Sequence, residues 1–217
     1  MIINIDKPIG WSSFDVVKKV KNITKHKKVG HAGTLDPFAS GVLIIGTDSD
    51  TKKLTGITNS DKAYEAQLEL GKTTNTLDTE GEIIHMKAIP EFDSGKIKSI
   101  LNKFLGKQKQ KPPMYSAKKH KGVRLYNIAR KNIEVERKDI EISIHNIELV
   151  DFTKNVIRFI VECSKGTYVR VLGNDIAKKL DTVGYLSALK RTKVGDYLIS
   201  DSLSIDGFQD KWKSIHH

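Results

Sequence analysis

The stretch "GHAGTLDPFASGVL", residues 30–43, runs from a loop of small residues into an apolar strand and holds one carboxylate, Asp36. Gly, Ala, Thr and Ser recur through it and favour a loop over a helix. Asp36 lies five residues after His31 and directly before Pro37. Because Asp-Pro is a frequent turn dipeptide, spacing alone favours a turn residue. The run of small residues also allows a second interpretation, a loop shaped to receive a ligand.

A helix is predicted before this loop and a strand, at residues 42–46, after it. Residues 12–25 follow a Ser12 or Ser13 N-cap and carry apolar residues at helical spacing, namely Phe14, Val17, Val20 and Ile23. Further strands are expected at residues 2–5, 62–71, 133–136, 139–151, 155–163 and 194–199, and further helices at residues 94–105, 123–130 and 168–180. Residues 185–191 are apolar and fit either element.

Strands outnumber helices in this pattern, and many strands are neighbours in the sequence. The sequence therefore predicts an α+β fold, with a mixed and largely antiparallel sheet and flanking helices. No internal repeat or long linker divides the 217 residues, so a single domain over residues 1–217 is expected. Residues 106–122 are basic, polar and interrupted by proline, and they are predicted to form a long functional or mobile loop.

Composition argues against several protein classes. No apolar run approaches the length of a membrane span and the N-terminus lacks a signal-peptide pattern, so a cytoplasmic protein is expected. The lone cysteine, Cys163, can form no internal disulfide, and its apolar neighbours indicate a buried core residue. No cysteine or histidine pattern predicts a metal site. His216 and His217 are interpreted as a frayed or added tail.

The net charge of +11 favours a nucleic acid or another anionic surface as partner. Residues 18–34 contain six lysines and no acid, and residues 103–124 contain eight basic residues and no acid. Phe104 and Tyr115 stand within the second stretch, a mixture typical of binding to a polyphosphate backbone. A solvated lysine-rich surface is the plainer alternative, and the sequence does not distinguish DNA from RNA.

Two further motifs contain residue types found in binding or catalytic sites. "GKTT" at 71–74 matches the end of a nucleotide-binding P-loop, but Ala66 replaces the required first glycine and the preceding residues alternate like a strand, which excludes that site. Arg170, in "SKGTYVRVLGNDI", could keep a catalytic carboxylate ionised in a pocket that excludes water. The residues alone do not show whether Arg170 meets Asp36 or lies on the surface at the start of a helix.

Five larger segments and one short one, in this order, resemble the TruB family of tRNA pseudouridine synthases. They are "KPIGWSS" (7–13), "VGHAGTLDPFASGVL" (29–43), "TKK" (51–53), "KAYEAQLELGKTTNTLDTEG" (62–81), "QKPPMYSAKKHKGVRLYNIAR" (110–130) and "SKGTYVRVLGNDI" (164–176), and within them "GHAGTLDP" is highly specific. The resemblance extends from about residue 2 to about residue 200.

The resemblance implies an enzyme that isomerises uridine-55 in the T arm of tRNA to pseudouridine, with no cofactor and no metal. The target base would be flipped out of its loop and held in a pocket. Asp36 would act on the ribose, either by attacking C1′ or by removing the C2′ proton, and the sequence leaves both pathways open. The small residues around Asp36 would let the RNA backbone approach closely.

The resemblance also implies a substrate-binding set around Asp36. His31 would contact RNA and fill the space of the flipped base, and Tyr64 would stack on that base. Tyr168 belongs to the same set, and Arg170 would be the partner of Asp36. Its remaining members are Leu189, placed against the base by its spacing from Tyr168, and Lys7, expected to buttress the active site.

The resemblance implies that the partner is tRNA, with residues 106–122 closing over its T arm. It implies a monomeric protein with no membrane association. Many bacterial members carry a C-terminal RNA-binding domain of the PUA type, but only about 17 residues follow Ser200, so no complete domain of that type is expected. One competing hypothesis is a non-catalytic RNA-binding protein or tRNA chaperone on the same fold, against which the intact set of site residues argues. Another is a guide-dependent relative within a ribonucleoprotein.

Overall fold

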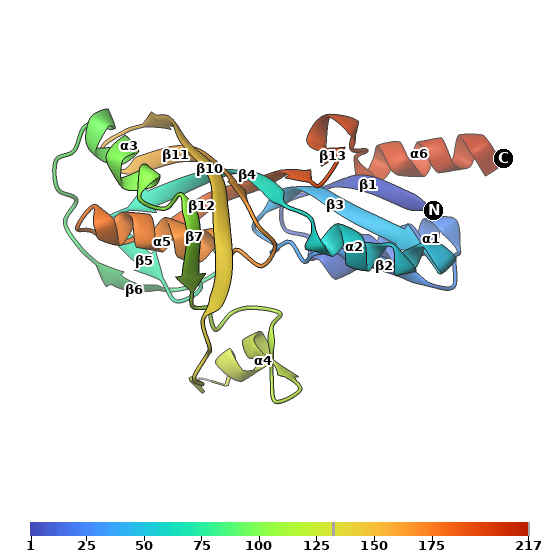
Figure 1. Ribbon diagram of the computed structural model, residues 1–217. Coiled ribbons are helices and arrows are strands. Elements are labelled where there is room, and N and C mark those ends of the chain that lie inside the picture. The colour runs from blue at the N-terminus through green and yellow to red at the C-terminus, as the bar shows by residue number, and fades with distance from the viewer. Residues whose placement is uncertain (132, 217) are drawn as a thin grey trace. The chain divides into compact units, whose positions relative to one another are not determined.

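The computed structural model describes residues 1–131 and 133–216, with only the backbone of residue 216. The chain divides into two compact units, unit 1 formed by Met1–Glu65 with Leu189–His217, and unit 2 formed by Ala66–Ala188. Nine strands belong to one mixed sheet, and two of them, β4 (Lys62–Leu70) and β12 (Gly184–Val194), have residues in both units (Figure 1). The predicted α+β class is confirmed.

Unit 1 is built on β3, an eight-residue strand buried almost throughout its length. β1 and β2 both pair antiparallel with β3, whereas β12 pairs with it in parallel and pairs antiparallel with β13. The elements of this unit, besides its parts of β4 and β12, are β1 (Ile2–Lys7), α1 (Ser13–Thr24), β2 (Val29–Ala32), β3 (Ser40–Thr47), a 3-10 helix (Asp48–Lys52), α2 (Leu54–Asn59), β13 (Tyr197–Leu198), a second 3-10 helix (Ile199–Asp201) and α6 (Ile205–His216).

Helices cover both faces of the unit 1 strands. Leu43 and Ile45 of β3 pack into one apolar cluster with residues of β1, α1 and α6. The alternate residues Val42 and Ile44 pack into a second cluster with Leu54 of α2. Because side chains alternate across a strand, these two clusters lie on opposite faces. This two-sided burial explains why β3 reads as a continuous apolar run in the sequence.

Helix α1 begins where the sequence predicted, with a different apolar face. Ser12 is the N-cap and forms a capping box with Asp15, which satisfies backbone donors at the start of the helix. Val17 and Val20 are buried as expected, but Phe14 is 70% exposed and Val16 is buried in its place. The interpretation of Phe14 as part of the apolar face was wrong because a strict spacing of three residues departs from the 3.6-residue helical period and leaves out the buried Val16.

Unit 2 packs helices against its own strands, with α3 against β10. β10 pairs antiparallel with both β11 and β7, and α5 approaches β4 and β12 at Gly173, where an added Cβ would lie 2.8 Å from Leu186 Cδ2. The buried Cys163 is confirmed. The elements are β5 (Lys72–Thr74), β6 (Ile83–Met86), α3 (Ser94–Asn102), β7 (Gly106–Gln110), β8 (Lys119–His120), β9 (Val123–Arg124), α4 (Leu125–Ala129), β10 (Ile140–Phe152), β11 (Val156–Cys163) and α5 (Val169–Lys179).

Two local predictions were wrong, and one helix was not predicted. The segment 106–122 is not one loop, because its first five residues form β7 and its later part contributes to the β8–β9 hairpin (Figure 1). No strand forms at 133–136, whereas the ambiguous segment 185–191 lies within β12. α6 was not predicted at all. The expectation for His217 and for the side chain of His216 lies outside the described residues. No helix in the described ranges is long and apolar enough to span a membrane.

Candidate active site

The loop that carries Asp36 connects β2 to β3, two antiparallel strands paired from Val29 with Thr47 to Ala32 with Ile44. The carbonyl of Asp36 accepts a hydrogen bond of 3.1 Å from the Ala39 N–H, which closes a four-residue turn with Pro37 at its second position. Ala39 is fully buried, and Leu35 and Phe38 of the same loop are also buried, whereas Asp36 is half-buried. The turn therefore anchors its apolar residues and leaves the carboxylate at the surface of unit 1.

Lys7, the last residue of β1, holds this loop in place. It is fully buried, and its Nζ donates hydrogen bonds to the carbonyls of Pro8 (2.9 Å), Trp11 (2.6 Å) and Pro37 (3.4 Å). The Pro37 carbonyl also accepts from the Gly10 N–H at 2.8 Å. A buried ammonium must be compensated by polar partners, and these carbonyls supply that compensation. Lys7 thus ties residues 8–11 to the carbonyl of Pro37, the residue that follows Asp36.

Arg191 braces the same loop from the β12 side, and sequence reasoning gave it no role. Its side chain is nearly fully buried at 1% exposure. Nε donates to the Val42 carbonyl at 2.7 Å and Nη2 donates to the Gly33 carbonyl at 3.1 Å. Gly33 and Val42 lie on either side of Asp36 in the chain, so one guanidinium fixes the distance between the two ends of the loop. Only the strand pairing shows this, because 149 residues separate Val42 from Arg191.

A glycine makes that pairing possible. Arg191 lies opposite Gly41 in the parallel ladder between β12 and β3. A Cβ at Gly41 would lie 2.2 Å from the Arg191 carbonyl oxygen, and Gly41 has a φ of +106° that disfavours other residues. Glycine therefore permits the close approach of β12 to the end of the Asp36 loop.

Three more predicted residues belong to unit 1. His31 lies on β2 and is half-buried. Tyr64 lies on β4 and Leu189 on β12, each 8% exposed. The structure thus assigns five of the predicted residues to this unit, namely Lys7, His31, Asp36, Tyr64 and Leu189.

The other two predicted residues, Tyr168 and Arg170, belong to unit 2. Tyr168 is the N-cap of α5, and the side-chain amide of Gln110 on β7 clamps both of its backbone groups. Gln110 Oε1 accepts from the Tyr168 N–H at 2.8 Å, and Nε2 donates to the Tyr168 carbonyl at 3.1 Å. That clamp fixes where α5 begins, and so where Arg170 enters the helix.

Arg170 is held by a polar network that sequence reasoning missed. Its Nη1 lies 3.2 Å from Asp78 Oδ2 and donates to the Thr76 carbonyl at 2.6 Å, while Nη2 donates to the Tyr115 carbonyl at 2.8 Å. Arg170 is 4% exposed and Asp78 is 2% exposed. Asp78 also accepts from the Thr76 hydroxyl at 2.5 Å and from the Glu80 N–H at 2.9 Å. A buried ion pair is tolerated when further hydrogen bonds satisfy it in this way.

Comparison with known proteins gives the family. A model of the TruB family pseudouridylate synthase (N terminal domain) matches residues 21–169. The chain belongs to the TruB family. It is 41% identical over 212 residues to tRNA pseudouridine synthase B of Chlorobaculum tepidum, a match covering 95% of this chain and 88% of that protein. It is 46% identical over 205 residues to tRNA pseudouridine synthase B of Clostridium kluyveri, covering 94% of this chain and 71% of that protein.

A solved relative supports the same TruB fold. The crystal structure of a Cbf5-Nop10-Gar1 complex contains a chain that matches with a TM-score of 0.78 and 26% sequence identity. The match covers 100% of this chain and 56% of that one, so this chain spans little more than half of its length. The pairing of Arg170 with Asp36, residues of different units, stays a prediction, as do the roles of the other site residues.

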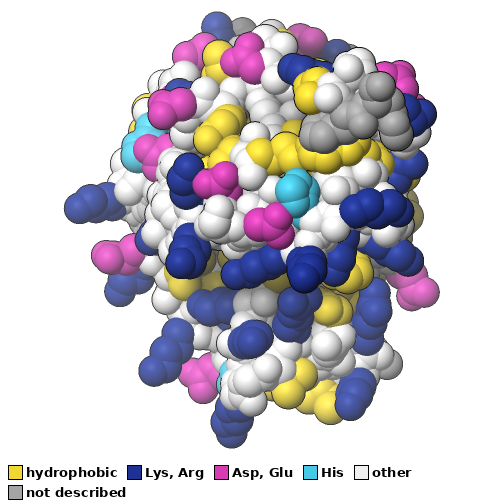
Figure 2. All heavy atoms as spheres, turned by 90° about the vertical axis from the view of Figure 1, so that its right-hand side faces the viewer, with side chains coloured by type: hydrophobic (Ala, Val, Ile, Leu, Met, Phe, Trp, Pro, Cys, Tyr) yellow, Lys and Arg dark blue, Asp and Glu magenta, His cyan; other side chains and the backbone are white. Residues whose placement is uncertain are grey.

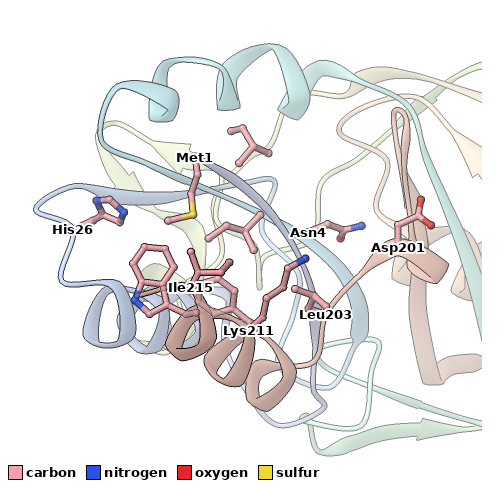
Figure 3. A pocket seen from close by; sticks show the side chains of 11 residues that line it. Met1, Asn4, His26, Asp201, Leu203, Lys211 and Ile215 are labelled. Atoms are coloured by element: carbon pink, nitrogen blue, oxygen red, sulfur yellow. The ribbon is translucent and has the colours of Figure 1, made fainter. Parts of the chain in front are cut away.

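A separate hollow of unit 1 is lined by residues of β1 and α6 (Figure 3). Its volume is about 670 Å³, and Met1, Leu203, Trp212 and Ile215 give it a largely apolar wall. His26 lies at its edge, 5.8 Å from the Trp212 ring between centroids, and its Nδ1 lies 2.5 Å from Asp48 Oδ2. None of the seven predicted site residues lines this hollow.

Proposed function

We propose that this chain converts a uridine of tRNA, uridine-55 in the T arm, to pseudouridine. Family membership and the relatives named tRNA pseudouridine synthase B support the reaction. The observation that carries it is the half-buried Asp36, presented by a closed turn and braced through Lys7 and Arg191. A carboxylate that must meet one carbon of a ribose needs a backbone with little freedom, because misplacement by 1 Å costs about 100-fold in rate.

The reaction is an isomerisation in which every atom of the base is kept. The bond from C1′ to N1 breaks, the base turns, and a bond from C1′ to C5 forms. The proton on C5 is lost and N1 gains one, so no redox step or cofactor is part of the proposal. Asp36 acts on the sugar either as a nucleophile at C1′ or as a base at C2′, and both pathways need the ionised carboxylate.

The remaining site residues hold the RNA rather than break bonds. Tyr64 stacks on the flipped base and Leu189 packs against it, which offsets the cost of unstacking. His31 contacts the RNA where the base has left. Arg170, fixed by the Asp78 network, supplies a cation to pair with Asp36. Tyr168 completes the pocket from the start of α5.

The partner in this proposal is tRNA, bound by a monomer in the cytoplasm. Lysines of residues 106–122 contact phosphates of the T arm. This segment is tied to the site through the Tyr115 carbonyl, which accepts a hydrogen bond from Arg170. Closure of the segment on RNA would therefore act on the same guanidinium that serves Asp36.

The test uses an unmodified tRNA transcript carrying tritium at C5 of its uridines. The parent protein should release tritium without added metal or nucleotide, whereas Asp36→Asn should release none. Asparagine is close to isosteric, so thermal unfolding of the two proteins should coincide and their tRNA affinities should be similar. If the parent binds tRNA and releases no tritium, the activity is disproved and a non-catalytic RNA-binding or chaperone role replaces it.

A further inference from the structure

Helix α1 and its C-cap expose one aromatic and three lysine side chains. Phe14, Lys18 and Lys21 follow at intervals of four and three residues, which places them in a row on the helix surface, and Lys25 is the C-cap residue, in the left-handed conformation, at the end of that row. We call these four residues the α1 basic face. Phe14 is 70% exposed, and the three lysines are also exposed. The Phe14 ring is exposed to solvent at the first position of a row of cations, so it does not contribute to the hydrophobic core.

The opposite side of α1 explains why this face is free. Val16, Val17 and Val20 pack into the core cluster with strands β1 and β3 and with α6. In the described part of the chain, none of the three lysines forms an ion pair or a side-chain hydrogen bond. Asp15 is engaged in the capping box with Ser12. Figure 2 shows the side of the molecule where α1 and α6 lie, and Lys and Arg side chains gather on it.

The α1 basic face begins at the loop that carries Asp36. Ser13, next to Phe14, accepts a hydrogen bond from the Leu35 N–H at 2.9 Å and donates one to the Leu35 carbonyl at 3.0 Å. Leu35 precedes Asp36 in the chain. At a rise of 1.5 Å per residue, the row from Phe14 to Lys21 extends about 10 Å along the helix from that junction, and Lys25 follows at the C-cap. The face is therefore a track that leads away from the proposed catalytic residue.

We propose that the α1 basic face binds an RNA strand that continues from the flipped nucleotide. Phe14 stacks on a base, and Lys18, Lys21 and Lys25 contact successive phosphates. This inference rests on the proposed function, which makes tRNA the substrate, and it adds a contact surface outside the pocket and outside residues 106–122. Stacking aromatics combined with a basic track are the usual means of holding single-stranded RNA.

A protein partner fits the same face less well. A protein interface concentrates apolar and aromatic side chains at its centre and is depleted in lysine. Here a single aromatic residue lies at one end, and the rest of the row is lysine. Three cations in line match the repeating charge of a phosphodiester backbone.

The test compares two triple variants that each remove three positive charges. Lys18→Gln/Lys21→Gln/Lys25→Gln alters the α1 basic face. The control, called the α3 variant, is Lys96→Gln/Lys98→Gln/Lys154→Gln, which alters two exposed lysines of α3 and one in the turn between β10 and β11, all outside the two basic stretches. Affinity for a full-length unmodified tRNA is measured over a range of salt concentrations. The α1 variant should bind about 10-fold more weakly at moderate salt and lower the salt slope by about two, with a smaller effect from the α3 variant.

Substitutions of Phe14 separate the contribution of base stacking to tRNA affinity from that of charge. Phe14→Ala should weaken tRNA binding about 5-fold or more at every salt concentration and leave the salt slope unchanged, whereas Phe14→Trp should retain affinity. All these side chains are exposed, so thermal unfolding should stay at the parent value.

Two results would overturn this inference. They are an α1 triple variant that matches the α3 variant in affinity and salt slope, and a Phe14→Ala variant with the parent affinity; a protein partner for this face would predict both. Binding is read independently of tritium release. A parent protein that binds tRNA but forms no pseudouridine would therefore disprove the proposed function. The affinity measurements would still decide whether the α1 basic face binds RNA.

Discussion

Two buried cations, Lys7 and Arg191, hold the backbone on either side of Asp36, and both use carbonyl oxygens to do so. The two cations reach the Asp36 loop from two different strands, β1 and β12. A loop fixed from two strands holds its carboxylate in one position, which a group acting on a single carbon of the substrate requires.

Arg191 should be a positioning residue whose loss affects turnover more than binding. Arg191→Met removes both hydrogen bonds to the loop and leaves the Gly33 and Val42 carbonyls unpaired, which costs about 2–4 kcal/mol of stability. We expect the single-turnover rate to fall at least 10-fold with little change in tRNA affinity. Exogenous guanidinium at sub-denaturing concentration should partly restore the rate of an Arg191→Ala protein. An unchanged rate at saturating tRNA would show that the loop does not need this brace.

Asp78 should be required for the stability of Arg170 in its buried position. Asp78→Asn removes the carboxylate that lies 3.2 Å from the buried Arg170 guanidinium, and breaking a buried pair of this kind costs about 3–5 kcal/mol. Urea unfolding would measure the loss. The matched control is the same change in an Arg170→Met background, where no charge remains to be compensated and the cost should fall to below about 2 kcal/mol. Equal costs in both backgrounds would contradict the coupling.

At the scale of elements, the packing of β12 against β3 depends on one residue without a side chain. Gly41→Ala would place a Cβ 2.2 Å from the Arg191 carbonyl oxygen at a φ of +106°. We expect a loss of more than about 2 kcal/mol, or failure to fold. Gly56→Ala is the control, because Gly56 is exposed on α2 and its Cβ would meet nothing within 4 Å. That variant should be neutral or more stable by up to about 1 kcal/mol, and chemical denaturation compares the two.

The first 3-10 helix, Asp48–Lys52, should make part of the stability sensitive to acid. Hydrogen bonds from Lys53 and from the Met1 amino group lower the pKa of Asp50 from 3.8 to about 2. A carboxyl group with a lowered pKa in the folded state stabilises fully above its unfolded value and loses that contribution as the pH falls. The difference in Tm between the parent and Asp50→Asn should therefore be constant down to about pH 4 and shrink towards pH 2. A constant difference throughout would contradict this.

Element type followed from local pattern wherever burial was one-sided or complete. Apolar and polar residues alternate in β4, β3 is continuously apolar, and α1 begins with a capping box. Each of these elements could therefore be predicted from its own sequence. β7 was not, because "GKQKQ" is polar and becomes a strand only by pairing with β10. The same limit applies to the site. Asp36 stands out in its own loop, whereas Arg191 and Asp78 gain their roles from contacts 149 and 92 residues away in the chain.

At the scale of the whole molecule, a net charge of +11 should make tRNA binding steeply dependent on salt. Each phosphate contacted by a lysine or arginine releases counterions, and six or more such contacts weaken binding about 1,000-fold or more between 50 and 200 mM salt. The basic stretches 18–34 and 103–124 provide enough cations for that number of contacts. Filter binding of an unmodified transcript over this range measures the slope.

The rate of the chemical step should depend much less on salt than tRNA affinity does. Salt screens the contacts that bring RNA to the protein and not those of the flipped uridine inside its pocket. The single-turnover rate at saturating protein should therefore change less than about 3-fold over the salt range in which affinity changes by orders of magnitude. A rate that falls in parallel with affinity, even at saturation, would mean that screened contacts also hold Asp36 and the uridine in register. In that case the basic surfaces would belong to the catalytic machinery as well as to the grip on tRNA.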